Sequence, residues 1–229
     1  DQTSFANKNP GVWAALNLHG SATGHVLVYG GRFYKFDPAQ PGTETAAWMA
    51  AHPSGFVADG FGSTFDGVDT YVVAPALDYV DCGTYMEVYT AKGLMKWAYA
   101  VNELGKLDYG LVLMNNINMP AFTITNDDAN ETYKFTTTPI TVTEGVPSGS
   151  NWNVVCTNVS NLTDGYTGNI DGQNFTINGL RVVQSGNYAG FIGFMYDGGE
   201  VKNLTFNDAV VNGGSATGVA VGRAQDEIG

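Results

Sequence analysis

The sequence repeats a short apolar pattern toward its C-terminal end, and this repeat limits the folds open to the chain. Residues 177–182 (INGLRV) and 201–206 (VKNLTF) both read apolar-x-x-apolar-x-apolar, 24 residues apart. Two Gly-bracketed apolar segments, 190–193 (GFIG) and 218–222 (GVAVG), are 28 to 29 residues apart. Strands that stay in phase while turns vary in length are typical of a solenoid, whose coils cover one another's apolar faces. The repeat therefore predicts stacked coils from about residue 165.

The 24-residue offset makes a specific structural prediction. Ile177 should lie directly above Val201, and Leu180 above Leu204, so that like side chains are layered over like. Glycine and asparagine suit the corners between strands, because glycine adopts positive φ freely and asparagine tolerates the left-handed region. Seventeen of the twenty asparagines follow residue 100, which favours coils in that part of the chain.

The remaining chain is predicted to be β-rich, with two helices. Residues 1–80 alternate β-branched or aromatic runs with glycine and proline turns, which is typical of short strands. Residues 45–52 (TAAWMAAH) form a plausible short helix. Residues 91–104 place apolar side chains at i, i+3, i+4 and i+7 and are followed by Gly105. This spacing and this glycine predict the one long helix of the protein.

We therefore predict an all-β fold in two regions. Residues 1–84 form a small β-rich domain or the end of a preceding solenoid, and residues 85–229 form a parallel β-helix. The long helix should pack Leu94, Trp97 and Val101 over the first coil. Such a cap is needed because an open solenoid end exposes unpaired strand edges.

Residues 120–150 interrupt the repeating part of the sequence. They are rich in threonine, contain three prolines, and include the acidic run 126–131 (NDDANE). We interpret this run as an excursion loop outside the core.

The charge balance excludes several classes of partner. Ten Lys and Arg against 22 Asp and Glu give a net charge of −12, without a basic cluster, which argues against nucleic acid and anionic membranes. No apolar run approaches the ~20 residues of a membrane-spanning helix. Only 14% of the residues are charged, as is typical of exported β-proteins. Neither end carries a leader or a capping element, so we expect a processed or excised piece of a secreted or outer-surface protein.

Two cysteines, Cys82 and Cys156, are present. They form either one disulfide in an oxidising compartment or two buried thiols, and both readings stay open. Neither belongs to a C-x-x-C pair or lies near a histidine pair, which makes a metal role unfavourable.

Several segments together resemble one bacterial family. Residues 168–180 (GNIDGQNFTINGL) are similar to the G-x-x-D-G-x-x-x-T-I-x-x-L block of GLUG-motif proteins, and 189–193 (AGFIG) and 201–204 (VKNL) continue it. The resemblance covers about residues 85–229, although 116–118 (NIN) stands where an acidic D-I-D is more usual. It implies a right-handed parallel β-helix in a secreted or surface-anchored adhesin of the Bacteroides type. It implies no known enzymatic site and no cofactor.

Two groups of carboxylates are candidates for chemistry. Asp127, Asp128 and Glu131 form one group, and Asp164 and Asp171 form the other. Glycosidases use two carboxylates ~5–9.5 Å apart, and the oxygen-rich run at 126–131 also suits calcium. The alternatives are a solvated loop for the first group and turn-forming aspartates for the second. We favour these alternatives, because no D-x-[DN]-x-[DN]-G spacing and no neighbouring basic partner is visible.

Aromatic side chains are a further set of candidates for ligand binding. Tyr166, Tyr188 and Tyr196 fall at expected corners of successive coils, where they could stack on sugars. Packing between coils is the alternative role for such rings. His19 and His25 flank a turn and could meet, but no third partner is evident for a catalytic or metal site.

The leading prediction is a non-enzymatic adhesin-like protein that binds a host or microbial glycan or a surface protein. The competing class is a carbohydrate-active enzyme, a polysaccharide lyase or glycosidase, on a β-helix scaffold. A passive stalk that spaces another module from the cell is the third.

Overall fold

The computed structural model describes residues 26–41, 46–157 and 159–226. Strands predominate, as expected for the all-β class, and two α-helices lie among the described residues. The chain divides into two compact units, Asp1–Leu77 and Asp78–Gly229. This division precedes the expected boundary at 84/85, because β4 (Tyr79–Asp81) pairs antiparallel with β5 (Tyr85–Val88) and belongs to the second unit.

The first unit is built on a three-stranded antiparallel sheet in the order β1-β3-β2. Its core includes Phe56, which is fully buried and lies 5.1 Å, between ring centroids, from Trp48 on the short helix. That helix confirms the prediction for residues 45–52 within the described part of the chain. The elements are β1 (Gly31–Tyr34), α2 (Ala46–Ala51), β2 (Phe61–Phe65) and β3 (Thr70–Pro75).

In the second unit, successive passes of the chain pair with one another in parallel. One sheet has the order β17-β12-β6-β5-β4, with parallel pairing throughout except between β4 and β5. A second has the order β18-β13-β7, and the pairs β14-β19, β15-β20 and β16-β21 are parallel as well. The strands are β6 (Gly110–Leu113), β7 (Ile117–Asn118), β12 (Asn169–Asp171), β13 (Thr176–Asn178), β14 (Arg181–Val183), β15 (Tyr188–Ala189), β16 (Ile192–Tyr196), β17 (Glu200–Lys202), β18 (Thr205–Asn207), β19 (Val210–Asn212), β20 (Ala216–Thr217) and β21 (Val221–Gln225).

The observed register corrects the expected one. Ile177 pairs with Phe206 rather than Val201, and Val201 pairs with Ile170. Leu180 does not lie over Leu204: its carbonyl accepts from the Val210 backbone N–H. The 24-residue offset is therefore wrong: paired residues of the last two passes are 28 to 31 positions apart, close to the spacing of the Gly-bracketed segments. The cause is that every strand of a pass carries the same inward apolar alternation, so the pattern also matches between strands that are not neighbours. Leu111 and Ile170, which pair across the preceding two passes, are 59 positions apart because the excursion lies between them.

The interior of the second unit is layered with apolar side chains. Leu111, Ile170 and Ile177 are fully buried, whereas Val201 and Phe206 on the last pass are only half-buried. The last pass has fewer neighbours because β17 to β21 each pair on one side only among the described residues.

The helix α3 (Ala91–Asn102) covers this interior and confirms the predicted long helix. Its N-cap Thr90 accepts a hydrogen bond from the Gly93 N–H, and Gly105, at φ +67°, follows its end. Leu94, Trp97 and Val101 are buried as expected. The Trp97 ring lies nearly parallel to those of Trp152 and Phe191, at centroid distances of 6.4 and 5.9 Å.

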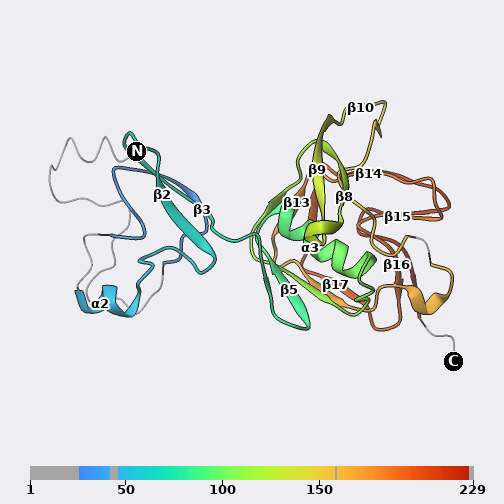
Figure 1. The fold of residues 1–229 in the computed structure, drawn as a ribbon, viewed down its shortest axis with the longest axis horizontal. Helices are drawn as coiled ribbons and strands as arrows, with labels where there is room; N and C mark the ends of the chain where they lie inside the picture. Colours follow the sequence, from blue (N-terminus) through green and yellow to red (C-terminus); the bar gives the residue numbers. More distant parts are fainter. Residues whose placement is uncertain (1–25, 42–45, 158, 227–229) are drawn as a thin grey trace. The chain divides into compact units, whose positions relative to one another are not determined.

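The expected excursion loop is an antiparallel hairpin. The alternating Thr, Phe and Tyr residues on both sides of the acidic run favour strands, and the run itself forms the exposed tip. We call β8, η1 and β9 together the hairpin; it runs alongside α3 (Figure 1). The elements of this region are β8 (Phe122–Asp127), the 3-10 turn η1 (Asp128–Asn130), β9 (Thr132–Pro139), β10 (Val142–Thr143), β11 (Val146–Pro147) and, further on, the 3-10 turn η2 (Leu162–Asp164).

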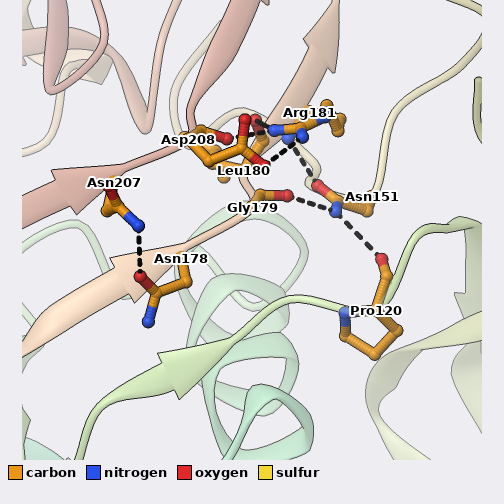
Figure 2. Close-up of polar contacts among 8 residues, drawn as sticks. All are labelled: Pro120, Asn151, Asn178, Gly179, Leu180, Arg181, Asn207 and Asp208. Atoms are coloured by element: carbon orange, nitrogen blue, oxygen red, sulfur yellow. Dashed lines mark hydrogen bonds and ion pairs between the residues drawn. The ribbon is translucent and has the colours of Figure 1, made fainter. Parts of the chain in front are cut away.

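One buried asparagine joins the two ends of this excursion. The Asn151 amide nitrogen donates to the carbonyls of Pro120 and Gly179, both at 2.9 Å (Figure 2). Its side-chain oxygen accepts from the Arg181 backbone N–H at 2.7 Å. Asn151 is fully buried, and a buried amide without such partners would be costly. The side chain thus connects both ends of the excursion to the parallel strands.

Candidate functional site

A groove of about 510 Å³ lies between α3, the start of β4 and the hairpin. It combines the exposed ring of Tyr79 and the half-buried ring of Phe135 with amide, hydroxyl and charged groups. Figure 1 shows the hairpin and α3 that form its walls. The lining residues are Asp78, Tyr79, Lys92, Lys96, Asp127, Asn130, Thr132, Tyr133, Lys134 and Phe135.

The helix wall carries two lysines. Lys92 and Lys96 are four residues apart and therefore project from one face of α3, away from buried Leu94. The Lys96 ammonium donates to the Asn130 carbonyl at 3.1 Å and lies 3.5 Å from a carboxylate oxygen of Glu131. Within the described residues, the Lys92 ammonium has no ion-pair or hydrogen-bond partner.

The hairpin wall is positioned by two tyrosines. The rings of Tyr99 on α3 and Tyr133 on β9 meet edge to face, with centroids 5.4 Å apart. The Tyr133 hydroxyl donates to the Glu103 carboxylate at 2.6 Å. Burial, followed by this carboxylate, raises the pKa of Tyr133 well above its usual value. Tyr133 is therefore a neutral donor that connects the hairpin to the end of α3.

Successive side chains of β9 point alternately toward α3 and away from it. Lys134 follows buried Tyr133 and points outward, where its ammonium lies 3.5 Å from a carboxylate oxygen of Asp127. Phe135 is half-buried and Tyr79 is 38% exposed. The two rings offer apolar surface in a groove whose other groups can form hydrogen bonds and ion pairs.

The acidic residues of the predicted loop lie close together, but each of their carboxylates has a different partner. Asp127 lines the groove beside Lys134, and Glu131 is paired with Lys96. Asp128 accepts from the Tyr99 hydroxyl at 3.0 Å, and burial together with this carboxylate raises the pKa of Tyr99. Within the described residues, no three acidic, His or Cys groups are arranged to hold a metal ion. The acidic run thus offers calcium no convergent set of ligands.

The second predicted pair, Asp164 and Asp171, is used in local turns. Asp171 accepts from the Gln173 backbone N–H at 2.9 Å and the Asn203 amide at 3.1 Å, and its pKa is lowered, mainly by the Gln173 bond. Asp164 accepts from the Asn161 backbone N–H at 3.0 Å. Both therefore act as turn-forming residues, in agreement with the alternative considered above.

The three predicted tyrosines differ in exposure. Tyr166 is fully buried, with its ring edge-on to Trp97 and its hydroxyl donating to the Tyr109 carbonyl at 3.0 Å. A sugar cannot stack on it, so its proposed exposed role is wrong: the ring packs in the core against Trp97 of α3. Tyr188 and Tyr196 are half-buried on either side of Phe194. The Arg223 guanidinium lies over the Tyr188 ring at 5.9 Å.

The described cysteines and His52 lie in separate environments. Cys82 is exposed and Cys156 is buried, and both are free. Burial raises the pKa of the Cys156 thiol to about 12, which keeps it protonated near neutral pH. His19 and His25 lie outside the described residues. His52 stacks on Trp48 with ring centroids 4.3 Å apart.

A second polar feature follows the sheet β7-β13-β18. The Asn178 amide donates to Asn118 at 3.0 Å, and the Asn207 amide donates to Asn178 at 3.0 Å (Figure 2 shows the second contact). We call these three side chains the asparagine ladder. Each amide of this ladder is already partly paired with its neighbour.

The groove residues Tyr79, Lys92, Lys96 and Lys134 were not identified from the sequence. The spacing of Lys92 and Lys96 on the polar face of a predicted helix was a usable signal. Nothing in the sequence indicated that Lys134 would lie across from them.

Comparison with known proteins gives a partial likeness. No protein-family model matches the chain, and no solved structure matches it. A stretch of 72 residues, 31% of the chain, is 38% identical to Halomucin of Haloquadratum walsbyi. The stretch spans about 1% of that relative's length. No helix among the described residues is long and apolar enough to cross a membrane.

Proposed function

We propose that this chain is a non-enzymatic, adhesin-like protein of the cell surface or the extracellular space that binds a glycan. The observation that carries the proposal is the groove, where exposed Tyr79 and half-buried Phe135 lie among charged and amide groups. Sugars present apolar ring faces together with hydroxyl groups, and this combination is the one that such a groove complements. The same features would also suit the surface of a protein as the partner.

The proposed scaffold is a right-handed parallel β-helix in residues 85–229. It is supported by the parallel pairing of each pass with the next and by the buried apolar layers of Leu111, Ile170 and Ile177. The resemblance to GLUG-motif proteins supports the handedness and the surface location. A net charge of −12 and a surface rich in Asn and Thr fit a partner other than nucleic acid.

The test is a glycan array with the whole chain, followed by calorimetry on any oligosaccharide it retains. Tyr79→Ala should weaken binding about 3- to 10-fold, because one aromatic contact contributes about 0.5–1.5 kcal/mol. Tyr85→Ala removes a comparably exposed tyrosine outside the groove and should leave affinity unchanged. Equal affinity of wild type and Tyr79→Ala would contradict the groove as the site, and a blank array would favour a passive stalk.

A carbohydrate-active enzyme is the second candidate, and one observation favours it: two carboxylates, Asp78 and Asp127, line the same groove. Asp78 accepts from the Thr90 hydroxyl at 2.5 Å, and Asp127 is paired with Lys134. A reducing-end assay on the retained oligosaccharide separates the two functions. Cleavage that is lost in both Asp78→Asn and Asp127→Asn would establish the enzyme, whereas binding without cleavage supports the adhesin.

A further inference from the structure

We propose that the groove prefers acidic glycans, those whose sugars carry carboxylate groups, over neutral ones. This inference rests on the proposed function and names its ligand class. It begins from the distribution of positive charge in an acidic protein.

Nine of the ten basic residues lie in the described part of the chain. Three of them, Lys92, Lys96 and Lys134, line the one groove. The other six have partners: Arg32 with Asp66, Arg181 with Asp208, Lys202 with Glu200, Lys35 over Tyr34, Lys106 over Tyr109, and Arg223 over Tyr188 and Phe194. The groove thus brings three ammonium groups together, and Lys92 among them is without an ion-pair or hydrogen-bond partner in the described residues.

The ammonium groups of the groove differ in how available they are. Lys92 has no partner among the described residues. Lys134 is 56% exposed and Asp127 is 18% exposed, and their contact is long, at 3.5 Å; long ion pairs with a solvent-exposed partner contribute little to stability. Lys96 is more buried and is bound to the Asn130 carbonyl and Glu131. Lys92 on the helix wall and Lys134 on the hairpin wall are therefore the two groups that would receive an anion.

The carboxylates of the groove are already engaged. Asp78 accepts from the Thr90 hydroxyl, and Asp127 accepts from the Asn130 amide at 3.1 Å besides pairing with Lys134. Glu131, next to the groove, is 60% exposed and paired with Lys96. Three ammonium groups against two lining carboxylates and the adjacent Glu131 make the groove close to neutral in a chain of net charge −12. An anion therefore meets less repulsion at the groove than the charge of the whole protein would give.

The aromatic surface determines the kind of anion. A free inorganic anion would gain nothing from Tyr79 and Phe135, whereas a sugar acid places an apolar ring face and a carboxylate within one residue. Two ammonium groups on opposite walls also suit a chain with an acidic group on successive sugars. These features together select a polyuronate-like glycan.

The experiment compares an oligogalacturonate with its carboxyl-reduced neutral counterpart by calorimetry on the whole chain. The acidic form should bind at least about 10-fold more tightly, since charge-assisted hydrogen bonds are the stronger ones. Lys92→Gln and Lys134→Gln should each weaken the acidic form about 3- to 10-fold and leave the neutral form unchanged. Lys202→Gln, which removes a paired lysine on β17, is the matched control. Raising the salt concentration should weaken only the acidic form.

The outcomes separate this inference from the proposed function. Equal binding of the two forms, or a preference for the neutral one, would overturn the inference and leave a glycan-binding protein. Acidic binding that survives both lysine substitutions would also overturn it, because the ligand would then lie elsewhere. Binding of neither form, together with a blank glycan array, would overturn the proposed function itself. Circular dichroism of each variant distinguishes lost contacts from lost folding.

Discussion

The parallel strands and the hairpin of the second unit differ in how their contacts arise. Between parallel strands, contacts recur from one pass to the next, as in the series Leu111–Ile170–Val201 and Ile117–Ile177–Phe206. Along the hairpin, each contact occurs once, as in the bond from Tyr133 to Glu103. The repeated contacts build a scaffold, and the single ones shape the groove. A site on such a protein is therefore expected where the repeat is interrupted.

The largest loss of stability is expected for a substitution at the contact between α3 and the core of the parallel strands. Trp97→Ala removes a ring packed against Trp152 and Phe191, and also the indole N–H that donates to the Tyr109 carbonyl at 3.0 Å. Loss of a buried aromatic of this size costs about 3–5 kcal/mol of unfolding free energy. Urea unfolding followed by circular dichroism measures it.

Tyr85→Ala, an exposed substitution on β5, is the control for that experiment and should change stability by less than about 0.5 kcal/mol. If Trp97→Ala cost no more than the control, the helix would not be part of the cooperative core.

Asn151 tests whether the scaffold and the hairpin depend on each other. Asn151→Ala leaves the Pro120 and Gly179 carbonyls without their partner and should cost about 2–3 kcal/mol, given the penalty for unpaired buried groups. Because Asn151 lies at the end of the excursion, glycan affinity should fall as well. Calorimetric binding and urea unfolding are measured on the same samples.

Asn178→Ala, in the exposed asparagine ladder, is the matched asparagine control and should cost less than about 1 kcal/mol. Lost stability with unchanged glycan affinity in Asn151→Ala would mean that the hairpin holds its position without this residue.

The hydrogen bond between Tyr133 and Glu103 tests how much one contact of the hairpin contributes to stability. Tyr133→Phe should cost about 1 kcal/mol, the usual contribution of one hydrogen bond. The raised pKa of Tyr133 adds a pH dependence: the unfolded chain loses this proton near pH 10, while the folded protein keeps it. The stabilisation linked to this proton is thus present below pH 10, and it is lost as the pH rises toward the pKa of Tyr133 in the folded state.

Unfolding midpoints of wild type and Tyr133→Phe between pH 7 and 11 measure this effect. The two curves should converge at the alkaline end. Parallel curves over the whole range would exclude a linked titration at Tyr133.

The smallest effect is expected at a corner of the scaffold. The pKa of Asp171 is lowered by the bonds from Gln173 and Asn203, so its contribution is present above the unfolded pKa near 4 and is lost as the pH falls below it. Asp171→Asn should reduce the acid sensitivity of unfolding slightly, by less than about 1 kcal/mol, because the residue is only half-buried and solvent screens its carboxylate. Asp208→Asn is a comparison at an exposed aspartate, and an Asp171→Asn curve identical to wild type from pH 2 to 7 would contradict the role.

Several elements of the fold were predictable because their signals are local. The apolar spacing of α3 and the glycine after it depend on residues within one helix, and the short helix at 46–51 depends on a few alanines before Pro53. The sequence predicted that strands of successive passes lie next to one another, but it did not predict which residues pair. Many strands share one alternation, so the pairing of Ile177 with Phe206 required knowledge of where each turn ends.

The candidate site was predictable only in part. The acidic run at 126–131 was placed outside the core, and it lies at the tip of the hairpin. Tyr166 was expected at an exposed corner and is buried, because a ring at a corner can turn inward or outward with the same sequence pattern. Lys134 stays exposed at the groove because its neighbour Tyr133 takes the position against Tyr99.

The sequence by itself determined the β-rich character, the helix that covers the core and the repeated apolar strands, since these follow from spacing along the chain. The tertiary structure decided the register, the burial of each tyrosine and the groove. These depend on contacts between residues far apart in the sequence, among them the bonds of Asn151 and the tyrosine pair that hold the hairpin against the rest of the unit. Local patterns set which surfaces are apolar, and only packing sets which surfaces meet.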